Sequence, residues 1–207
     1  MLVVRIKGFS LVELMVVLTI MSVLLLFAVP EFTVWRANSE VHSIAEALQN
    51  DLRQAQAEAV RRNRQVAFVL TNDTPTEANP SFTETVTGNN WALISLPLLN
   101  SGEAANEASG STGFILSHIQ KANSVTTVTG DVSALCFNSV GRLATSSAAI
   151  EDAGDANCTP PTTTAPLEFQ IQHPRANRPL RVQVRLGGQI RMCNPNKSLA
   201  TSADGCA

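Results

Sequence analysis

The pattern of hydrophobic and polar residues divides the chain into three parts. Residues 14–29 are apolar at almost every position. They belong to a stretch of 21 residues from Phe9 to Val29, close to the roughly 20 that a helix needs to cross a bilayer. Past residue 30 the apolar residues recur at helical spacings, and past residue 64 they occur in short stretches. The pattern therefore predicts one long N-terminal helix followed by a β-rich part.

The second half of this helix carries one apolar face. Pro30 has no amide hydrogen, so we expect it to kink or locally open the helix. The apolar residues then follow spacings of three and four, which place them in a single stripe. We therefore expect this half to pack against a globular head. The stripe consists of Val41, Ile44, Leu48, Leu52, Ala55 and Ala59.

The head is predicted to consist of β-strands. Alternation of apolar and polar residues, typical of half-buried antiparallel strands, is clearest at residues 167–172, 180–186 and 188–193. Shorter apolar stretches between polar loops predict further strands at residues 65–71, 91–96, 113–117 and 134–138. Two segments low in apolar residues, 100–113 and 151–166, are expected to be exposed loops.

The last two predicted strands flank the sequence "LGG", residues 186–188. A two-residue turn would place an apolar residue opposite a polar one, which breaks the rule that paired residues share a face. A three-residue loop instead pairs Arg185 with Gln189 and Val184 with Ile190, so the faces agree. Gly188 can take the positive φ that such loops use. We therefore predict a hairpin with a three-residue loop.

The 207 residues carry a net charge of only −2, but the charge is unevenly distributed. Nine acidic and two basic residues lie between positions 65 and 165, against six basic and two acidic ones from position 166 onward. The C-terminal part is therefore basic. Its arginines are predicted on the outer face of the hairpin and on the loop before it, at Arg181, Arg185, Arg191, Arg175 and Arg178.

No pattern typical of an enzyme or a metal centre is found. The sequence contains no GxSxG, no P-loop and no HExxH motif. The histidines His42, His118 and His173 are far apart in sequence and are interpreted as structural. We expect Trp35 and Trp91 to be core or interface anchors. The sequence thus predicts a protein that is not an enzyme and holds neither a cofactor nor a metal.

The four cysteines form no CxxC pair, and no histidine lies close by, so zinc is not expected. In an exported chain an even number of cysteines suggests disulfides, and four cysteines allow three connectivities. We favour Cys136–Cys158 and Cys193–Cys206, because each closes a loop rich in Gly, Pro, Ser and Thr. Each disulfide would contribute on the order of 3 kcal/mol to stability.

The N-terminus decides whether the chain is exported. The apolar run follows Arg5 and Lys7, but it is at the long end for a signal peptide, and no A-x-A cleavage site follows it. The basic residues on its N-terminal side predict a membrane helix with a cytoplasmic N-terminus. Glu13 does not fit a simple anchor, since a carboxylate in the bilayer costs up to about 2.5–3.5 kcal/mol. It therefore suggests a function and requires a partner.

The stretch "GFSLVELMVVLTIMSVLLLFAVP" resembles the N-terminus of type IV pilins and type II secretion pseudopilins. The resemblance implies cleavage by a prepilin peptidase between Gly8 and Phe9, followed by methylation of Phe9. It also implies that Glu13 and Pro30 are the glutamate and proline that this family uses in assembly. The new amine on Phe9 would be a cation in an apolar setting, and Glu13 of a neighbouring subunit can neutralise it. Glu13 would thereby set the axial register between subunits.

The segments "SVGRLATS", "VRLGGQIRMC" and "CNPNKSLATSADGC" are similar to the GspH/FimT-type minor pseudopilins. This resemblance implies a minor subunit at a filament tip that helps start assembly of a type IV pilus or secretion pseudopilus. Some FimT-like members bind DNA through a G-R-x-R turn, and here the matching tetrapeptide is "GQIR", with Gln189 in place of the first arginine. The arginines therefore have three candidate roles: a subunit contact, DNA binding in natural transformation, or solvation.

We therefore expect an α+β protein of the type IV pilin-like fold, with a long N-terminal helix packed on an antiparallel sheet. The expected parts are a leader at 1–8, a transmembrane and filament-core helix at 9–29, an amphipathic helix at 30–63 and a periplasmic head at 64–207. The expected partners are other minor pilins, the major pilin, prepilin peptidase and the inner membrane. DNA is the alternative partner.

Overall fold

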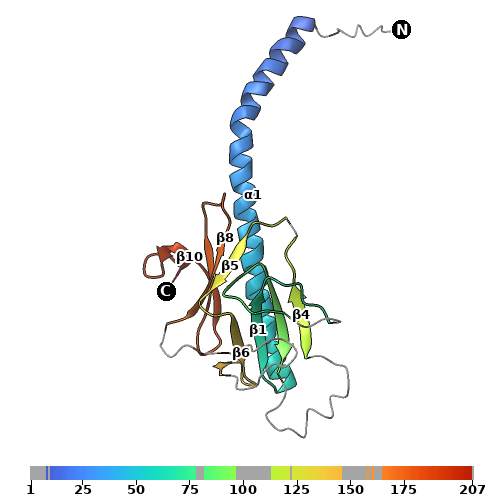
Figure 1. Cartoon of the computed structure of the whole chain (residues 1–207). Coiled ribbons are helices and arrows are strands. Elements are labelled where there is room, and N and C mark those ends of the chain that lie inside the picture. The colour runs from blue at the N-terminus through green and yellow to red at the C-terminus, as the bar shows by residue number, and fades with distance from the viewer. Residues whose placement is uncertain are drawn as a thin grey trace, which may run out of the picture.

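The computed structural model shows a long helix that projects from a head made of two β-sheets (Figure 1). The described residues are 8, 10–77, 82–96, 113–121, 123–145, 158, 160 and 165–206, without the side chains of residues 27, 28 and 30. The cleaved segment predicted at residues 1–8 therefore lies almost wholly outside them, and so does Phe9. The same holds for most of the two loops predicted at 100–113 and 151–166.

Helix α1 (Leu11–Arg62) contains 52 residues and begins after the N-cap Ser10. Its axis bends by 43° between an N-terminal arm, Leu11–Leu26, and a C-terminal arm, Glu31–Arg62. The bend falls in the segment that contains Pro30, where the missing amide predicts one. Neither arm alone, within the described residues, is long and apolar enough to span a membrane, but the bent pair meets both requirements.

The strands form two sheets. The first has the order β4-β3-β1-β6-β7, with β4 (Phe114–His118), β3 (Asn90–Ser95), β1 (Val66–Thr71), β6 (Ala134–Phe137) and β7 (Leu143–Ala144). The second has the order β11-β10-β9-β8-β5-β2, with β11 (Gly205–Cys206), β10 (Ile190–Ser198), β9 (Leu180–Val184), β8 (Leu167–Gln172), β5 (Thr127–Gly130) and β2 (Thr87–Gly88). All pairs are antiparallel except β10 and β11.

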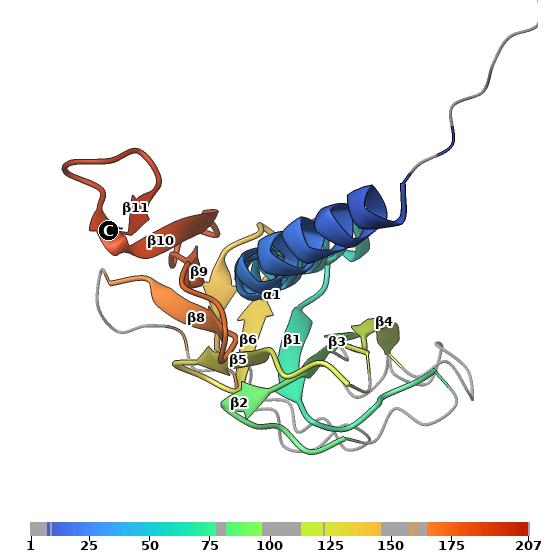
Figure 2. The same ribbon diagram turned by 90° about the horizontal axis from the view of Figure 1, so that it is seen from above.

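The C-terminal arm of α1 lies over both sheets, with β8–β10 on one side and β1, β3 and β4 on the other (Figure 2). All six residues of the predicted apolar stripe are buried against the sheets. They pack in one cluster with large side chains such as Phe68, Trp91 and Phe169. A second cluster covers the opposite face of the first sheet, which explains why β1 is buried at every position.

The hairpin prediction is confirmed in detail. Val184 pairs with Ile190 and Gln183 with Arg191, and the amide of Arg185 donates to the carbonyl of Gln189 at 3.0 Å. Gly188 has φ +85°. A Cβ at this position would lie 2.0 Å from the carbonyl oxygen of Gly141, so the turn needs glycine for both backbone angle and space.

The other strand predictions are confirmed with small shifts at their ends. Four strands were not predicted, namely β2, β5, β7 and β11. Three of them contain only two residues, which is too short to show a period. The fourth, β5, consists of "TVTG" and carries a single buried apolar residue, Val128.

Candidate functional site

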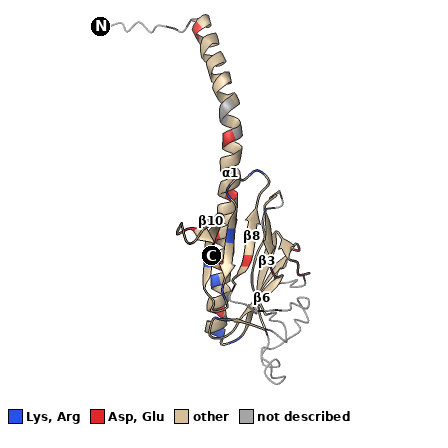
Figure 3. Cartoon of the chain, turned by 90° about the vertical axis from the view of Figure 1, so that its left-hand side faces the viewer, with Lys and Arg blue, Asp and Glu red and all other residues tan. Residues whose placement is uncertain are grey.

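The N-terminal arm of α1 stands clear of the head and is apolar on all sides. Its large side chains are 51–76 % exposed from Leu11 to Leu26. Charged residues are sparse along this arm compared with the head (Figure 3). A helix that is apolar all round is normally covered by other protein or by lipid, so this surface requires a partner.

Glu13 is the acidic residue in the first turn of α1. The helix begins after Ser10, whose side chain makes no capping hydrogen bond, while its carbonyl accepts from the amide of Leu14 at 3.1 Å. Glu13 is exposed, and its carboxylate has no partner among the described residues. Gly8 is also exposed. The predicted cleavage and methylation at Phe9 remain predictions, because Phe9 lies outside those residues.

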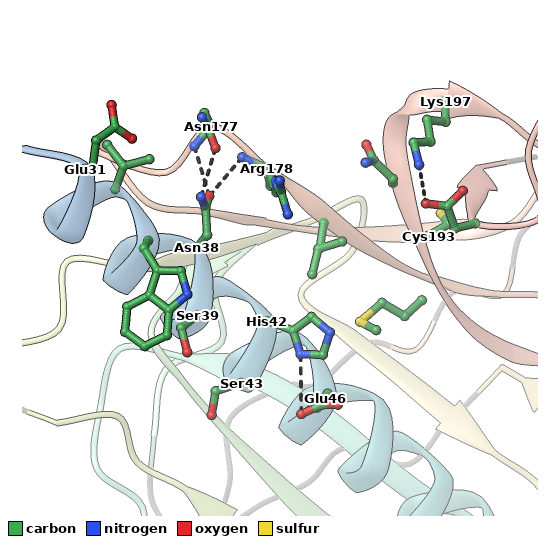
Figure 4. Close-up of a pocket in the computed structure, with 16 residues that line it drawn as sticks. Glu31, Asn38, Ser39, His42, Ser43, Glu46, Asn177, Arg178, Cys193 and Lys197 are labelled. Atoms are coloured by element: carbon green, nitrogen blue, oxygen red, sulfur yellow. Dashed lines mark hydrogen bonds and ion pairs between the residues drawn. The ribbon is translucent and has the colours of Figure 1, made fainter.

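Asn38 attaches the loop before β9 to the helix. Its side-chain oxygen accepts hydrogen bonds from the amides of Asn177 and Arg178, both at 3.1 Å. Its side-chain nitrogen donates to the side-chain oxygen of Asn177 at 2.9 Å. Figure 4 shows the three contacts at one end of a groove between α1 and β10. The loop at residues 173–179 is thus held where the helix leaves the head.

Glu40 attaches a second loop to the same part of the helix. One carboxylate oxygen accepts from the hydroxyls of Ser124 at 2.7 Å and Thr126 at 2.8 Å. Partial burial acts to raise the pKa of Glu40, but these hydrogen bonds and the charges of His173 and Arg36 together hold the pKa below its ordinary value. The ionised carboxylate therefore stabilises the attachment.

Asp51 connects the helix to the first sheet. Its Oδ2 accepts from Nε1 of the fully buried Trp91 at 2.8 Å and lies 3.6 Å from Nδ1 of His118. The Trp91 and His118 rings stack at 4.2 Å. Burial raises the pKa of Asp51, against the opposing effects of Trp91 and His118, and burial lowers the pKa of His118. Both tryptophans were expected to be core or interface anchors. Trp91 is an anchor of the core, whereas Trp35 is 64 % exposed.

The C-terminal tail is closed by the disulfide Cys193–Cys206, and Cys136 pairs with Cys158. These are the two disulfides favoured from the sequence. Nη2 of Arg191 donates to the main-chain oxygens of Ala203 at 2.7 Å and Gly205 at 2.8 Å. The hydrogen bond from Lys197, with a second one from Ser202, lowers the pKa of Asp204 to about 2.

Two family models match the chain. The model described as "Type II transport protein GspH" matches residues 45–188, more than half of the sequence. The chain belongs to the GspH family. The model of the prokaryotic N-terminal methylation motif matches residues 4–29, which include Gly8, Phe9 and Glu13. The chain is accordingly a minor pilin or pseudopilin, a structural subunit rather than an enzyme.

Two solved structures are similar to this GspH-family chain. The type IV minor pilin FimU of Pseudomonas aeruginosa (strain PAO1) is 17 % identical, with a TM-score of 0.46 over 77 % of this chain and 92 % of that one. The minor pseudopilin EpsH of the Vibrio cholerae type 2 secretion system is 13 % identical, with a TM-score of 0.42 over 76 % and 99 %. No curated protein matches in sequence.

The predicted basic face is not one free surface in this GspH-family chain. Nη1 of Arg181 forms a salt bridge of 2.7 Å with Glu168, which also accepts a hydrogen bond from the buried Gln183. Arg191 is engaged by the tail. Only Arg185 of the three hairpin arginines has a guanidinium without a partner among the described residues. Gln183 pairs with Glu168 and Arg191 on the neighbouring strands and so shares their outer face, but it is buried there rather than exposed.

The remaining two arginines lie at the other end of the strand. Arg175 and Arg178 are exposed on the loop that Asn38 holds near the start of the head. The hairpin turn contacts Gln56, whose Nε2 donates to the carbonyls of Gly141 and Gly188, near the C-terminal end of α1. The five arginines are therefore spread along the length of β9, from the loop before it to the turn after it, and two of them, Arg181 and Arg191, are engaged by other groups.

The residues that hold the head to the helix were not predicted from the sequence. Asn38, Glu40 and Asp51 were outside the apolar stripe, and their polar character indicated only a solvent-exposed face. One feature of the sequence could have pointed to them. Positions beside an apolar stripe are half-buried once the helix packs on a sheet, and a polar side chain there needs a hydrogen-bond partner. No cluster of three or more His, Cys, Asp or Glu in the described part of the chain could hold a metal ion.

Proposed function

We propose that this chain is a minor subunit that helps start assembly of a type IV pilus or a type II secretion pseudopilus. The observation that carries the proposal is the N-terminal arm of α1. It is exposed on all sides, its carboxylate at Glu13 has no partner within the described part of the chain, and it coincides with the N-terminal methylation motif. A neighbouring subunit in a filament would cover the apolar surface and neutralise the charge together.

The chemistry of the N-terminus follows from this arrangement. Cleavage between Gly8 and Phe9 by a prepilin peptidase would leave an amine four residues before Glu13, and that amine would then be methylated. The amine and the carboxylate are both costly in an apolar environment when alone. Pairing the Phe9 amine of one subunit with Glu13 of the next removes both costs, and it selects one axial register. Pro30 would allow the arm to bend away from the head.

The proposed location has two stages. Before assembly, the arm crosses the inner membrane once, with the N-terminus in the cytoplasm and the head in the periplasm. After processing, the subunit moves into the tip of the filament beside other minor subunits and the major pilin. The two disulfides support a periplasmic head, because that compartment is oxidising.

The test replaces Glu13 by alanine and uses Glu31→Ala as the matched control, since Glu31 is an exposed acid on the same helix beyond the bend. Glu13→Ala is expected to insert in the membrane and to be cleaved normally, but to lose most filament assembly. Glu31→Ala is expected to assemble. Filaments sheared from cells, and the subunit left in the membrane, are measured by immunoblot. Normal assembly of Glu13→Ala would refute the pairing.

The alternative is a DNA-binding subunit used in natural transformation. The contacts of Arg181 and Arg191 with Glu168 and the tail count against it, because they leave few free cations on the hairpin to neutralise phosphates. A gel shift with the full chain in detergent tests it. A shift at low salt that disappears in Arg185→Ala would favour the alternative over a contact between subunits.

A further inference from the structure

The head end from which α1 emerges carries an unusual combination of side chains. Four exposed cations surround the helix there, Arg36, Lys121, Arg175 and Arg178, and none forms a salt bridge with a described residue. Four large apolar side chains are exposed beside them, Phe32, Trp35, Ile119 and Val125. We call these eight residues the helix-exit surface.

The lining of three grooves shows that these residues are neighbours. One groove is lined by Phe32, Arg36, Val125 and Arg175. A second is lined by Trp35, Arg36, Ile119 and Lys121. The third has a volume of about 1050 Å³, contains Trp35 and Arg178, and is drawn in Figure 4. Cations and exposed apolar side chains thus line the same grooves beside the helix.

The surface is held in place by the attachments at Asn38 and Glu40 and by two further hydrogen bonds. Asn38 accepts from the amide of Arg178, and the imidazole Nδ1 of His173 accepts from the amide of Arg175 at 3.0 Å. Glu40 holds the loop that carries Val125, and the side-chain oxygen of Asn90 accepts from the amide of Gln120 at 2.9 Å, next to Lys121. The exposed side chains therefore lie on loops whose backbone is held by hydrogen bonds to α1, to β3 and within the loop itself.

The position of this surface along the helix identifies its partner. Trp35 lies 24 residues after Leu11, which is about 36 Å along the helix at about 1.5 Å per residue. The hydrocarbon core of a bilayer is about 30 Å thick, and its headgroups extend the total to about 40–45 Å. If the arm spans the membrane, Phe32 and Trp35 reach the headgroup region, where aromatic residues are enriched. Their rings lie 5.6 Å apart.

We infer that the helix-exit surface docks the head on the anionic phospholipid headgroups of the bilayer in which the arm of α1 is inserted. The inference rests on the membrane insertion proposed above. The cations neutralise lipid phosphates, while Ile119 and Val125 enter the interface with the aromatic pair. Three exposed acids line the third groove: Glu31, Glu46, which lies 3.5 Å from Nδ1 of His42, and Asp204, which is paired with Lys197. The carboxylate of Glu40 accepts from Ser124 and Thr126 and interacts with the charge of Arg36. Docking holds the head upright on the membrane before the subunit enters a filament.

The experiment uses the full chain in vesicles of phosphatidylcholine, with or without phosphatidylglycerol. A reporter chain combines Val125→Trp with Trp35→Phe, so that the indole on the loop reports on the head rather than on the helix. Trp91 is fully buried and supplies a constant background. Quenching by lipids spin-labelled at the headgroup measures docking. We expect quenching to increase with phosphatidylglycerol and to fall in high salt.

Two variants of the reporter chain make the test specific. The loop variant contains Lys121→Gln, Arg175→Gln and Arg178→Gln. The far-end variant removes three cations from elsewhere on the head and contains Arg53→Gln, Arg142→Gln and Arg185→Gln. A basic residue near an anionic surface favours binding by about fivefold, so three change the docked-to-undocked ratio on the order of 100-fold. The loop variant should lose the effect of phosphatidylglycerol, and the far-end variant should keep it.

The outcomes separate the two proposals. Failure of the chain to float with phosphatidylcholine vesicles overturns both membrane insertion and docking. If the chain floats but phosphatidylglycerol does not change the quenching, docking alone is overturned. Docking is also overturned if the loop variant and the far-end variant lose the effect of phosphatidylglycerol equally. If the loop variant loses a gel shift with DNA but keeps its lipid quenching, the surface binds nucleic acid and the docking proposal is refuted.

Discussion

The contact between Asp51 and Trp91 leads to a quantitative prediction for the stability of the head. Replacing Asp51 by alanine leaves the indole N–H of a fully buried residue without an acceptor. Losing a hydrogen bond to a charged group costs about 1.5–3 kcal/mol. Burial of the carboxyl group, which raises its pKa, offsets part of this cost. We expect Asp51→Ala to lower the free energy of unfolding by about 2 kcal/mol.

Asp51→Asn is the matched variant, because its amide oxygen can still accept from the indole. We expect it to cost about 1 kcal/mol or less. Urea unfolding of the full chain in detergent, followed by far-ultraviolet circular dichroism, measures both changes. The alanine variant should also melt about 4–8 °C lower. Equal stability of the two variants, or a loss below about 0.5 kcal/mol in Asp51→Ala, would show that this contact does not hold the helix to the sheet.

Three further predictions use other parts of the head. Burial lowers the pKa of His118 in the folded state, so the unfolded state binds the proton more tightly. The free energy of unfolding should therefore rise as the pH increases toward 6.5. In unfolding curves measured across that pH range, His118→Gln should reduce this rise. Gly188→Ala should cost about 3 kcal/mol in unfolding free energy, while Gly187→Ala, where a Cβ meets nothing within 4 Å, should change it little; similar losses would refute the steric argument. Replacing Cys193 and Cys206 together by serine should cost about 3 kcal/mol and expose the tail to limited proteolysis, and a tail that stays protected would show that its hydrogen bonds suffice.

Local periodicity predicted the elements that depend on near neighbours in sequence. The buried stripe of α1 follows from helical spacing alone, because residues three and four apart share a face whatever packs against it. The register of the β9–β10 hairpin follows in the same way from alternation and from one glycine, Gly188. The disulfide Cys193–Cys206 joins residues only 13 apart across a loop. In each case the constraint operates within a short stretch of chain.

Contacts between distant segments could not be predicted from such patterns. Asn38 meets Asn177 across 139 residues, and Asp51 meets Trp91 across 40. A polar residue beside an apolar stripe has the same appearance in sequence whether it faces water or a buried donor. The pairing of charges on the predicted basic face was missed for the same reason. Nothing near Arg181 and Gln183 in sequence indicated that both would donate to Glu168, on the neighbouring strand.

The sequence alone determined the family resemblance, the apolar arm with Glu13, the amphipathic half of the helix and the main strands. Each of these depends on residues that are adjacent in the chain or recur at a regular spacing. Only the tertiary structure decided how the head is attached to the helix and which charges remain free. It brought Arg36, Lys121, Arg175 and Arg178 from three separate segments to the end of the head where α1 emerges. Burial and pairing depend on the packing of segments far apart in the chain, and that packing exists only once the chain is folded.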